Sequence, residues 1–433
     1  MAVPAPRRGV PLMAAPAMEA ARPEITTPGP RLSDGATVLR RFSAADAAAY
    51  AAIHRDPLNV QWAGSDPSMT AESAAVAIRD HIDTGWDDGR SLRFAVEELV
   101  DGNAAVVGTV SVHDVLRTAS GGSASVGIKM LPAGRGQGSA ARAIRLLCGY
   151  AFGTLGLDAL HWRATVGNLP SRRLAERCGF VLAAEIPGYG HVDGGIAAGW
   201  VFVLTAAQWL GGPSGAGRSD AGRSHADPGE AGLPVRGLEL EPVVPRLSDG
   251  SVVLRALADR DAPQLVENCT DPDAVRWTTV PLGYTSAHAA HFIGTITPDG
   301  WRSGKVLTFA VASAESDEFY GTVDLQCNDP GTASIGILMG THARGTGAAE
   351  QAVRLLAGYA FDQLNLGYLH WHALVPNWGS RKLAWKLGFR LEAEVRGGYN
   401  DRGTPGDRWT LSLAAGDPRT PQEPWTGPDP LTR

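Results

Sequence analysis

The sequence predicts an α/β (α+β) protein made of two tandem copies of one domain. Its 433 residues exceed what one hydrophobic core usually supports, so two domains are the expectation. The stretch RGQGSAARAIRLLCGYAFGTLGL begins at Arg135, and RGTGAAEQAVRLLAGYAFDQLNL begins at Arg344, 209 residues later. Within each copy, runs typical of strands alternate with runs typical of helices. We therefore expect two units that each contain a sheet and helices.

The repeat extends well beyond these two stretches. The same shift of 209 carries Asn168 onto Asn377 and Gly179 onto Gly388. Nearer the start of each copy the shift is 215, as for RLSDG at 31 and at 246. The six missing residues fall between matched elements, where surface loops tolerate deletions. We expect a disordered leader (1–30), a first domain (31–210), a flexible Gly- and Ser-rich linker (211–240), a second domain (241–415) and a disordered Pro-rich tail (416–433).

The elements of the first copy follow in order from local patterns. ATVLRR (36–41) predicts a short strand and SAADAAAYAAIHRD (43–56) an Ala-rich helix. Three β-rich runs follow: LRFAVEEL (92–99), AAVVGTVSVHDV (104–115) and SASVGIKML (123–131). SAARAIRLLCGYAFGTLG (139–156) has apolar residues at helical spacing. ALHWRATV (159–166) predicts a strand, NLPSRRLAERCGF (168–180) a short helix closed by glycine, and GWVFVLTAAQW (199–209) a last strand.

Composition excludes several classes of protein. The formal charge of −6 gives no electrostatic footprint for DNA or general nucleic-acid binding. No stretch approaches the roughly 18 apolar residues that span a bilayer, and the leader has no continuous apolar core of a secretion signal. The four cysteines lack disulfide or metal-ligand spacing. We expect a cytoplasmic protein without a metal or a membrane partner.

The repeated Arg-Gly-x-Gly motif has the chemistry of an anion site. A helix start leaves backbone N–H groups unpaired and carries partial positive charge. Gly136 and Gly138 let the backbone approach a bulky diphosphate, and Arg135 adds a permanent charge. Gly345, Gly347 and Arg344 repeat the arrangement in the second copy. This motif, which we call the cradle, predicts a pyrophosphate site; the alternative is a glycine-rich turn that only starts a helix.

The cradle and the stretch that follows it resemble the motifs of a known family. LPAGRGQGSAARAIRLLCGYAF followed by NLPSRRLAERCGFVLAAE, and ARGTGAAEQAVRLLAGYAF followed by NWGSRKLAWKLGFRLEAE, resemble the acyl-CoA-binding core of the GNAT N-acyltransferases. The resemblance is closest to the branch of ribosomal-protein N-terminal acetyltransferases and covers about 31–210 and 246–415. It implies two GNAT domains, each a mixed, mostly antiparallel twisted sheet flanked by helices. It also implies acyl transfer, with acetyl as the expected group, from acyl-CoA to a primary amine.

The resemblance assigns two groups of residues to the donor. Asn168 and Asn377 would contact the pantetheine arm, and Ser171 and Ser380 would lie near the thioester sulfur, where a hydroxyl can supply a proton to the thiolate. The alternative for both serines is helix N-capping. A backbone N–H near Ile128–Met130 or Ile337–Met339 would meet the oxyanion. The expected donor-binding residues are Ile128, Met130, Arg135, Gly136, Gln137, Gly138, Ser139, Ala140, Ile337, Met339, Arg344, Gly345, Thr346, Gly347, Ala348 and Ala349.

The general base departs from the family pattern. Many relatives carry a Glu two residues before the glycine of the strand that precedes the cradle, where this chain has Ser125 and Ser334. His113 in the first copy and Asp324 in the second are candidate bases. Histidines on a later strand are weaker candidates: His161, His370 and His372. Alternatively the amine arrives neutral and the protein only positions it.

The acceptor and the roles of the two copies stay open. Trp62 and Trp277 are candidates for the acceptor wall, or else core residues. The acceptor is a small-molecule amine or a peptide N-terminus. The second copy retains Glu350, Asp407 and Arg408, which are common in relatives, so it is the more complete. The duplication predicts a pseudo-dimer within one chain, which could further form a homodimer.

Two other functions are compatible with these motifs. One takes the acyl group from the phosphopantetheine arm of an acyl carrier protein, or from aminoacyl-tRNA, in natural-product biosynthesis. The acidic balance disfavours tRNA, whose binding depends on phosphate neutralisation. The other makes one half a non-catalytic acyl-CoA-binding scaffold.

Overall fold

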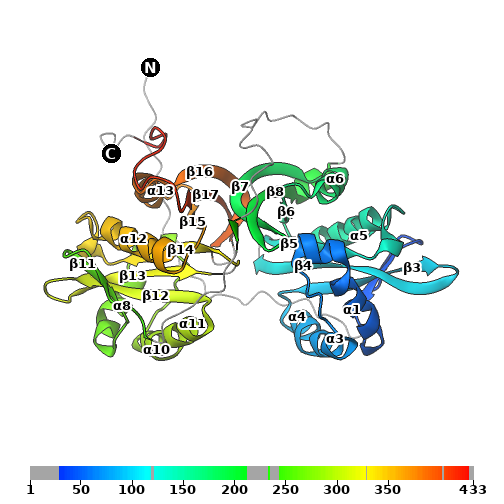
Figure 1. The fold of residues 1–433 in the computed structure, drawn as a ribbon, viewed down its shortest axis with the longest axis horizontal. Helices are drawn as coiled ribbons and strands as arrows, with labels where there is room; N and C mark the ends of the chain where they lie inside the picture. The colour runs from blue at the N-terminus through cyan, green and yellow to red at the C-terminus, as the bar shows by residue number, and fades with distance from the viewer. Residues whose placement is uncertain are drawn as a thin grey trace, which may run out of the picture.

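The computed structural model describes residues 29–118, 121–211, 233–234, 243–327, 329–401 and 404–428. The leader up to residue 28 and nearly all of the expected linker lie outside the described residues. The first half (29–211) and the second half (243–428) each form one sheet with helices on both faces (Figure 1).

The first half contains a mixed sheet with the strand order β1-β2-β3-β4-β5-β6-β8-β7. Neighbouring strands run antiparallel except β5 and β6, which are parallel. A short strand β9 (Leu233–Pro234) pairs with β8. The strands are β1 (Leu32–Ser33), β2 (Val38–Arg41), β3 (Leu92–Val100), β4 (Asn103–Thr118), β5 (Gly121–Met130), β6 (Ala159–Thr165), β7 (Val181–Val192) and β8 (Gly195–Thr205). The helices are α1 (Ala47–Arg55), α2 (Pro57–Ala63), α3 (Ala71–Ala77), α4 (Asp83–Asp88), α5 (Ser139–Gly153), α6 (Leu169–Arg177) and α7 (Ala206–Leu210).

The second half repeats this topology as β10-β11-β12-β13-β14-β15-β17-β16, with β14 and β15 parallel. Its strands are β10 (Leu247–Ser248), β11 (Val252–Arg255), β12 (Val306–Ser313), β13 (Phe319–Gln326), β14 (Thr332–Met339), β15 (Tyr368–Leu374), β16 (Arg390–Asp401) and β17 (Thr404–Ala414). Its helices are α8 (Ala262–Thr270), α9 (Pro272–Trp277), α10 (Ser286–His291), α11 (Thr297–Ser303), α12 (Ala348–Gly358) and α13 (Trp378–Lys386). Two mixed, mostly antiparallel sheets flanked by helices agree with the predicted fold class.

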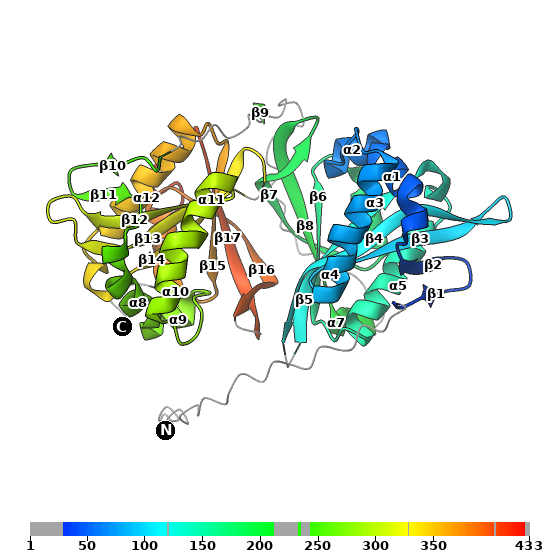
Figure 2. The same cartoon turned by 90° about the horizontal axis from the view of Figure 1, so that it is seen from below.

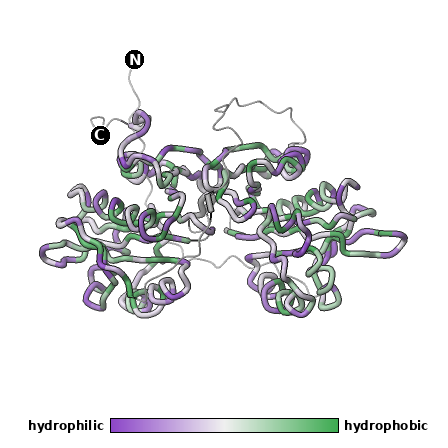
Figure 3. The backbone as a smooth tube through the Cα atoms, in the orientation of Figure 1, coloured by the Kyte–Doolittle hydropathy of each residue, from purple (hydrophilic) through white to green (hydrophobic). Residues whose placement is uncertain are grey.

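Helix α5 shows how the sequence builds the core. Its apolar side chains recur at helical spacing, and Ala143, Ile144, Leu147 and Ala151 are fully buried. Burial of each large aliphatic side chain is worth about 1.5–3 kcal/mol. Apolar residues concentrate along the central strands of both halves (Figure 3). The helices α1, α3 and α4 cover the sheet face opposite to α5 (Figure 1).

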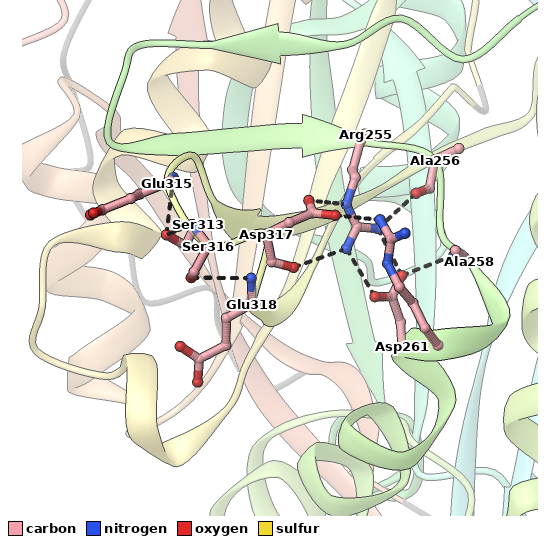
Figure 4. Close-up of polar contacts among 10 residues, drawn as sticks. Arg255, Ala256, Ala258, Asp261, Ser313, Glu315, Ser316, Asp317 and Glu318 are labelled. Atoms are coloured by element: carbon pink, nitrogen blue, oxygen red, sulfur yellow. Dashed lines mark hydrogen bonds and ion pairs between the residues drawn. The ribbon is translucent and has the colours of Figure 1, made fainter.

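An arginine at the end of the second strand of each half, Arg40 of β2 or Arg255 of β11, ties that strand to the turn that follows it. Arg255 Nη1 and Nη2 donate to the carboxylate of Asp261 at 2.8 and 2.9 Å, and Nε donates to Asp317 at 2.8 Å (Figure 4). Arg40 makes the same contacts with Asp46 and Glu97. Because the pairs are bidentate and partly buried, they fix the start of each half.

Each half has one strand more than its sequence pattern predicts. The pattern predicts one strand after α6, whereas β7 and β8 both follow it, and β16 and β17 follow α13. Pro187 and Gly188 stand in the middle of β7 and resemble turn signals. The register of β7 also shifts between Ile186 and Gly190, so alternation is broken where a strand pattern would be sought.

The missed strands join the two halves. Figures 1 and 2 show β7 and β16 facing each other between the sheets. Gly188 leaves no room for a Cβ beside the ring of Tyr368, and Gly397 lies in the same relation to Ala159. The apolar cluster at this contact contains Ala184, Ile186, Val201, Val203, Ala393 and Val395.

The expected disorder of the tail is wrong for residues 416–428. Trp385 Nε1 donates to the Glu423 carbonyl at 2.7 Å, and Arg381 Nη2 donates to Thr426 Oγ1 at 2.6 Å. The Trp425 ring lies 5.5 Å from that of Trp385. The prolines hold an extended segment whose aromatic side chain packs on α13, so composition alone did not reveal the contact. Among the described residues, no helix has the length and apolarity that crossing a membrane requires.

Candidate active site

Each half has a splay between its two parallel strands. The pairing of β5 with β6 ends at Val126 and Trp162, although β5 continues to Met130 and β6 to Thr165. In the second half pairing ends at Ile335 and Trp371, although β14 continues to Met339. Strand edges beyond these pairs leave backbone groups available to a ligand.

The splay exposes the amides that the sequence analysis expected at the donor. Leu131 N–H donates to Val107 O at 2.8 Å, toward β4. Because successive strand amides alternate in direction, those of Ile128 and Met130 point away from β4 and toward β6. Gly340 N–H donates to Tyr320 O at 2.8 Å, so Ile337 and Met339 have the same orientation in the second half.

The cradle glycines lie where the chain enters the helix. Gly136 and Gly138 have φ of 75° and 79°, and Gly345 and Gly347 have 76° and 92°. These values favour glycine. No side chain caps α5 or α12, whose N-caps are Gly138 and Gly347. Nothing lies within 4 Å of a Cβ placed on Gly136, Gly345 or Gly347, so the surface before each helix is open. Uncapped N–H groups beside open surface fit a diphosphate.

The other residues expected to bind the donor differ in exposure and in hydrogen bonding. Gln137 is exposed, and Ala140 and Ala349 are half-buried in the first helical turns. Ser139 is fully buried, and its hydroxyl donates to Glu98 at 2.5 Å, so it faces the protein interior. Thr346 Oγ1 donates to Ala343 O at 2.8 Å and accepts from the amide of Ala348.

The cradle arginines are not free charges. Arg135 Nη1 donates to Asp56 Oδ2 at 3.1 Å, and its other nitrogen pairs with Oδ1. Arg344 Nη2 donates to Asp271 Oδ1 at 2.5 Å. Burial alone would raise the pKa of Asp56, but hydrogen bonds from Arg135 and from backbone amides outweigh it and lower that pKa. Each arginine therefore ties its cradle loop to an aspartate that caps a helix earlier in the same half. Asp56 caps α2, and Asp271 caps α9.

The Asn-x-x-Ser motifs form a compact hydrogen-bonded unit. Asn168 caps α6, and its Oδ1 accepts from Ser171 N–H at 3.1 Å. Asn377 does the same for Ser380 at 3.0 Å. The alternative that the serines cap these helices is wrong, because the asparagines do. Ser171 Oγ accepts from Trp162 Nε1 at 3.0 Å, and Ser380 Oγ accepts from Trp371 Nε1 at 2.9 Å. Since the indoles only donate, each serine hydroxyl keeps its own proton for a second hydrogen bond.

Asp324 lies at the base of the second splay. It stands opposite Gly336, the first residue beyond the last β14–β15 pair. Its carboxylate occupies the space that a Cβ on Gly336 would need. Burial raises the pKa of Asp324 to about 6, and Gln326 Nε2 donates to its Oδ1 at 3.1 Å. Asp324 thus places a carboxyl group on the same face of the sheet as Ser334, one strand away.

The first half differs at this point. Ser111 takes the place of Asp324, with its Oγ 2.8 Å from the position of a Cβ on Gly127. His113 stands opposite Ser125, and its ring lies beside Gly127. Burial lowers the pKa of His113, and its Nδ1 has no hydrogen-bond partner among the described residues. His113 is thus a neutral ring next to the first splay.

The later strand histidines lie outside both splays. His161 Nε2 contacts the Arg396 carbonyl, His370 Nε2 the Pro187 carbonyl, and His372 Nε2 the Tyr189 hydroxyl. All three contacts cross from one half to the other. They hold the halves together, so these histidines are not candidate bases.

Helix α2 spans the first splay. Asn59 Nδ2 donates to Met130 O at 3.2 Å, and the Trp62 ring lies 3.6 Å from the Cβ position of Gly167, after β6. Trp62 and Trp277 are both half-buried, which fits an acceptor wall better than a core position. Asn59, Asp56 and Asp271 were not among the residues predicted for the site. The dipeptides Asp56-Pro57 and Asp271-Pro272, which are typical of a helix start, were the available signal for the two aspartates.

A splayed parallel strand pair beside an uncapped helix N-terminus, with an Asn-x-x-Ser unit after its second strand, suits a donor that carries a diphosphate, as in a group transferase. The family model described as Acetyltransferase (GNAT) domain matches residues 37–181 and 251–390. The uncharacterized N-acetyltransferase p20 of Bacillus licheniformis is 28% identical over 164 residues, which cover 37% of this chain and 92% of p20.

Two solved structures also match. RimJ of Mycobacterium smegmatis in complex with CoA-disulfide is 24% identical, with a TM-score of 0.36, and the match covers 42% of this chain and 90% of RimJ. Spermidine N-acetyltransferase of Vibrio cholerae in complex with CoA and spermine is 19% identical, with a TM-score of 0.36, and the match covers 41% of this chain and 99% of that enzyme.

The family model covers more than half of the chain in two copies, and the chain belongs to the GNAT acetyltransferase family. It is an acyl-CoA-dependent N-acyltransferase with two GNAT domains in tandem.

Proposed function

We propose that the second half transfers an acetyl group from acetyl-CoA to a primary amine by direct attack, and that each half binds one CoA. The observation that supports this most strongly is the position of Asp324 over Gly336, at the base of a splay whose second strand, β15, leads into the Asn377–Ser380 unit. A base and a proton donor then flank one gap, as direct transfer requires. We assign the two domains to 31–210 and 241–415. All four cysteines are free, which fits our assignment to the cytoplasm.

The residues act in a fixed order in this proposal. Bound acetyl-CoA supplies the activated thioester. The amides of Ile337 and Met339 hold the donor along β14, and the first turn of α12 holds its diphosphate. Asp324 takes a proton from the amine nitrogen as that nitrogen bonds to the acyl carbon and the carbon–sulfur bond breaks. Ser380 gives its proton to the departing sulfur and regains one from solvent.

The acceptor is a small-molecule amine or a peptide N-terminus. The names of two solved structures, spermidine N-acetyltransferase and the ribosomal L7/L12 alpha-N-protein acetyltransferase RimL, state such acceptors, and this class is all that we carry over. In the first half His113 would take the place of the carboxylate.

Calorimetric titration of acetyl-CoA tests the donor sites. A glutamate at Gly138 or Gly347 places a negative side chain where the diphosphate would lie, and strains a left-handed position. We expect two sites in the parent protein and one in each of Gly138→Glu and Gly347→Glu. The matched controls Gly149→Glu and Gly358→Glu alter helical glycines beyond the cradle, and should keep both sites. One site in the parent would make the other half a scaffold. No binding to folded protein would overturn free CoA as donor and favour a carrier-protein thioester.

A further inference from the structure

The acceptor face of the first splay carries cations that the proposed mechanism does not use. Lys129 lies on the splayed part of β5, opposite Thr109 of β4. Arg93 of β3 lies directly opposite Ser111 of β4. Ser111 in turn lies directly opposite Gly127 of β5. Residues directly opposite on adjacent strands share a face. Lys129 and Arg93 therefore lie on the Gly127 face of the sheet.

A histidine and a helix complete this group. His54, in α1, is half-buried, and neither ring nitrogen has a hydrogen-bond partner among the described residues. Burial, followed by the charges of Lys129 and Arg93, lowers the pKa of His54 to about 4. Burial and Arg93 lower the pKa of Lys129 to about 8. The group lies under α1 and α2, beside the amide of Asn59 that contacts Met130.

Among the residues that the structure describes, no carboxylate forms an ion pair with either cation. Within the described part of the chain, neither Lys129 nor Arg93 has an ion-pair partner, whereas most other arginines near the sheet do. Asp66 lies near His54, but it is exposed and accepts from Ser68 at 2.6 Å. Half-buried cations without a counter-charge repel one another and attract an anion.

The second half has none of these charges. Leu338 stands at the position of Lys129, opposite Thr322, and Thr308 stands at that of Arg93, opposite Asp324. Cys269 takes the place of His54 in the repeat. The ionisable group at the base of the splay is instead the Asp324 carboxyl. The two copies thus differ in the ionisable groups beside the splay, which are two cations in the first half and the Asp324 carboxyl in the second.

We infer that the two halves acylate different acceptors, and that the first half takes an amine that also bears an anionic group, a carboxylate or a phosphate, held by Lys129 and Arg93. This inference rests on the proposed function. Lys129 and Arg93 contact the anion, and the amine nitrogen lies toward the splay and His113. The second half, with Asp324 and without counterparts of Lys129 and Arg93, takes an amine without an anion. The chemistry is the same in both: nitrogen bonds to the acyl carbon, sulfur leaves, and one proton passes from nitrogen to the base.

The test compares matched acceptors in full-length protein with one donor site closed. Gly347→Glu leaves the first half to be measured, and Gly138→Glu leaves the second. The probes are a dipeptide with a free carboxylate against its carboxamide, and an aminohexose 6-phosphate against the parent aminohexose. The readout is kcat/KM for CoA release with acetyl-CoA. In the Gly347→Glu protein we expect at least one anionic probe to exceed its neutral partner by about tenfold or more, as for a hydrogen bond to a charged group.

Single substitutions assign the preference to the cations. Lys129→Met in the Gly347→Glu protein should bring the ratio to within about twofold, mainly through KM, because a ground-state contact is lost. Lys129→Gln is the second variant if Lys129→Met does not fold. The reciprocal Leu338→Lys in the Gly138→Glu protein should raise the preference of the second half for the anionic probe.

Each outcome decides one point. Three results would each overturn the inference. The first is a ratio of kcat/KM, anionic to neutral probe, near one in the Gly347→Glu protein. The others are a ratio that Lys129→Met and Lys129→Gln leave unchanged, and no CoA release from the first half with any probe. If the second half still acetylates neutral amines in those cases, the proposed function stands. Absence of CoA release from both halves with every probe would overturn the proposed function and the inference together.

Discussion

His370 Nε2 lies 2.8 Å from the carbonyl oxygen of Pro187, a residue of the other half. The same contact recurs 209 residues earlier, where His161 Nε2 lies 3.0 Å from the carbonyl oxygen of Arg396. Because a carbonyl oxygen only accepts, both rings carry a proton on Nε2 and donate it. Reciprocal contacts of this kind are the pattern of a two-fold dimer, here within one chain.

These contacts predict a measurable contribution to stability. His370→Ala leaves the carbonyl of the half-buried Pro187 without its donor and should lower the free energy of unfolding by about 1–2 kcal/mol. His161→Ala should cost less, because its contact is more exposed. Urea denaturation followed by fluorescence measures both. His291→Ala, at an exposed helical position, is the control and should change little; an unaltered midpoint for His370→Ala would contradict the role of this contact.

The same histidine predicts a pH dependence. Burial lowers the pKa of His370 to about 4, from 6.5 in the unfolded chain. Between these values the unfolded state binds a proton that the folded state does not, so stability falls as pH decreases from about 6.5 to about 4. Asp324 acts in the opposite sense below pH 6, because its folded pKa is raised.

The difference between parent and His370→Gln isolates the histidine, since the Asp324 effect cancels. We expect the stability of the parent to fall more steeply with decreasing pH than that of His370→Gln. Parallel curves between pH 4.5 and 7 would count against the buried, neutral His370.

Asp324 predicts the pH profile of the second half. Asp324→Asn should reduce kcat/KM in the Gly138→Glu protein by about a hundredfold or more, because a positioned base is lost. The parent rate should rise with pH through about 6, as the carboxyl ionises, and this limb should vanish in Asp324→Asn. Asp324→Glu should retain part of the rate. Gln326→Leu removes only the hydrogen bond to Asp324, and should keep the limb but shift it upward. A limb that survives in Asp324→Asn would assign the base elsewhere.

Replacing Ser380 should lower the turnover rate of the second half without weakening its binding of acetyl-CoA. Ser380→Ala should lower kcat of the second half by about tenfold to a hundredfold, since the departing sulfur loses its proton donor, and leave the Kd for acetyl-CoA nearly unchanged. It also leaves the Trp371 indole N–H unpaired, at a cost of about 1–3 kcal/mol in stability. Ser380→Cys keeps a weak donor and is the intermediate variant. A kcat equal to that of the parent would restrict Ser380 to a structural role.

Replacing the two cradle arginines should lower the stability of the fold by unequal amounts. The Asp56 side chain is 5% exposed and that of Asp271 is 17% exposed. Arg135→Ala therefore leaves the more deeply buried carboxylate and should destabilise the fold by about 2–3 kcal/mol, against about 1 kcal/mol for Arg344→Ala. Thermal denaturation measures the order. The neutral pair Arg135→Gln with Asp56→Asn should recover most of the loss. If Arg344→Ala proves the more damaging, burial of the aspartate does not set the cost.

The sequence was sufficient for the repeat and for the helix that opens at each cradle. These features are local, because positive-φ glycines and helical spacing depend on neighbours within a few residues. The fold class followed, because two copies of one pattern imply two similar sheets. The family resemblance drew on the same local motifs.

Only the tertiary structure decided which side chains meet. Arg135 reaches Asp56 across 79 residues, and His370 reaches Pro187 across 183. Asp324 lies over Gly336 because β13 and β14 pair in one register out of several that the sequence allows. The strands β7 and β16 escaped prediction because their glycines and bulges suit the contact between halves and not a regular alternation. Local patterns determine elements, whereas register and the packing of distant surfaces determine the site.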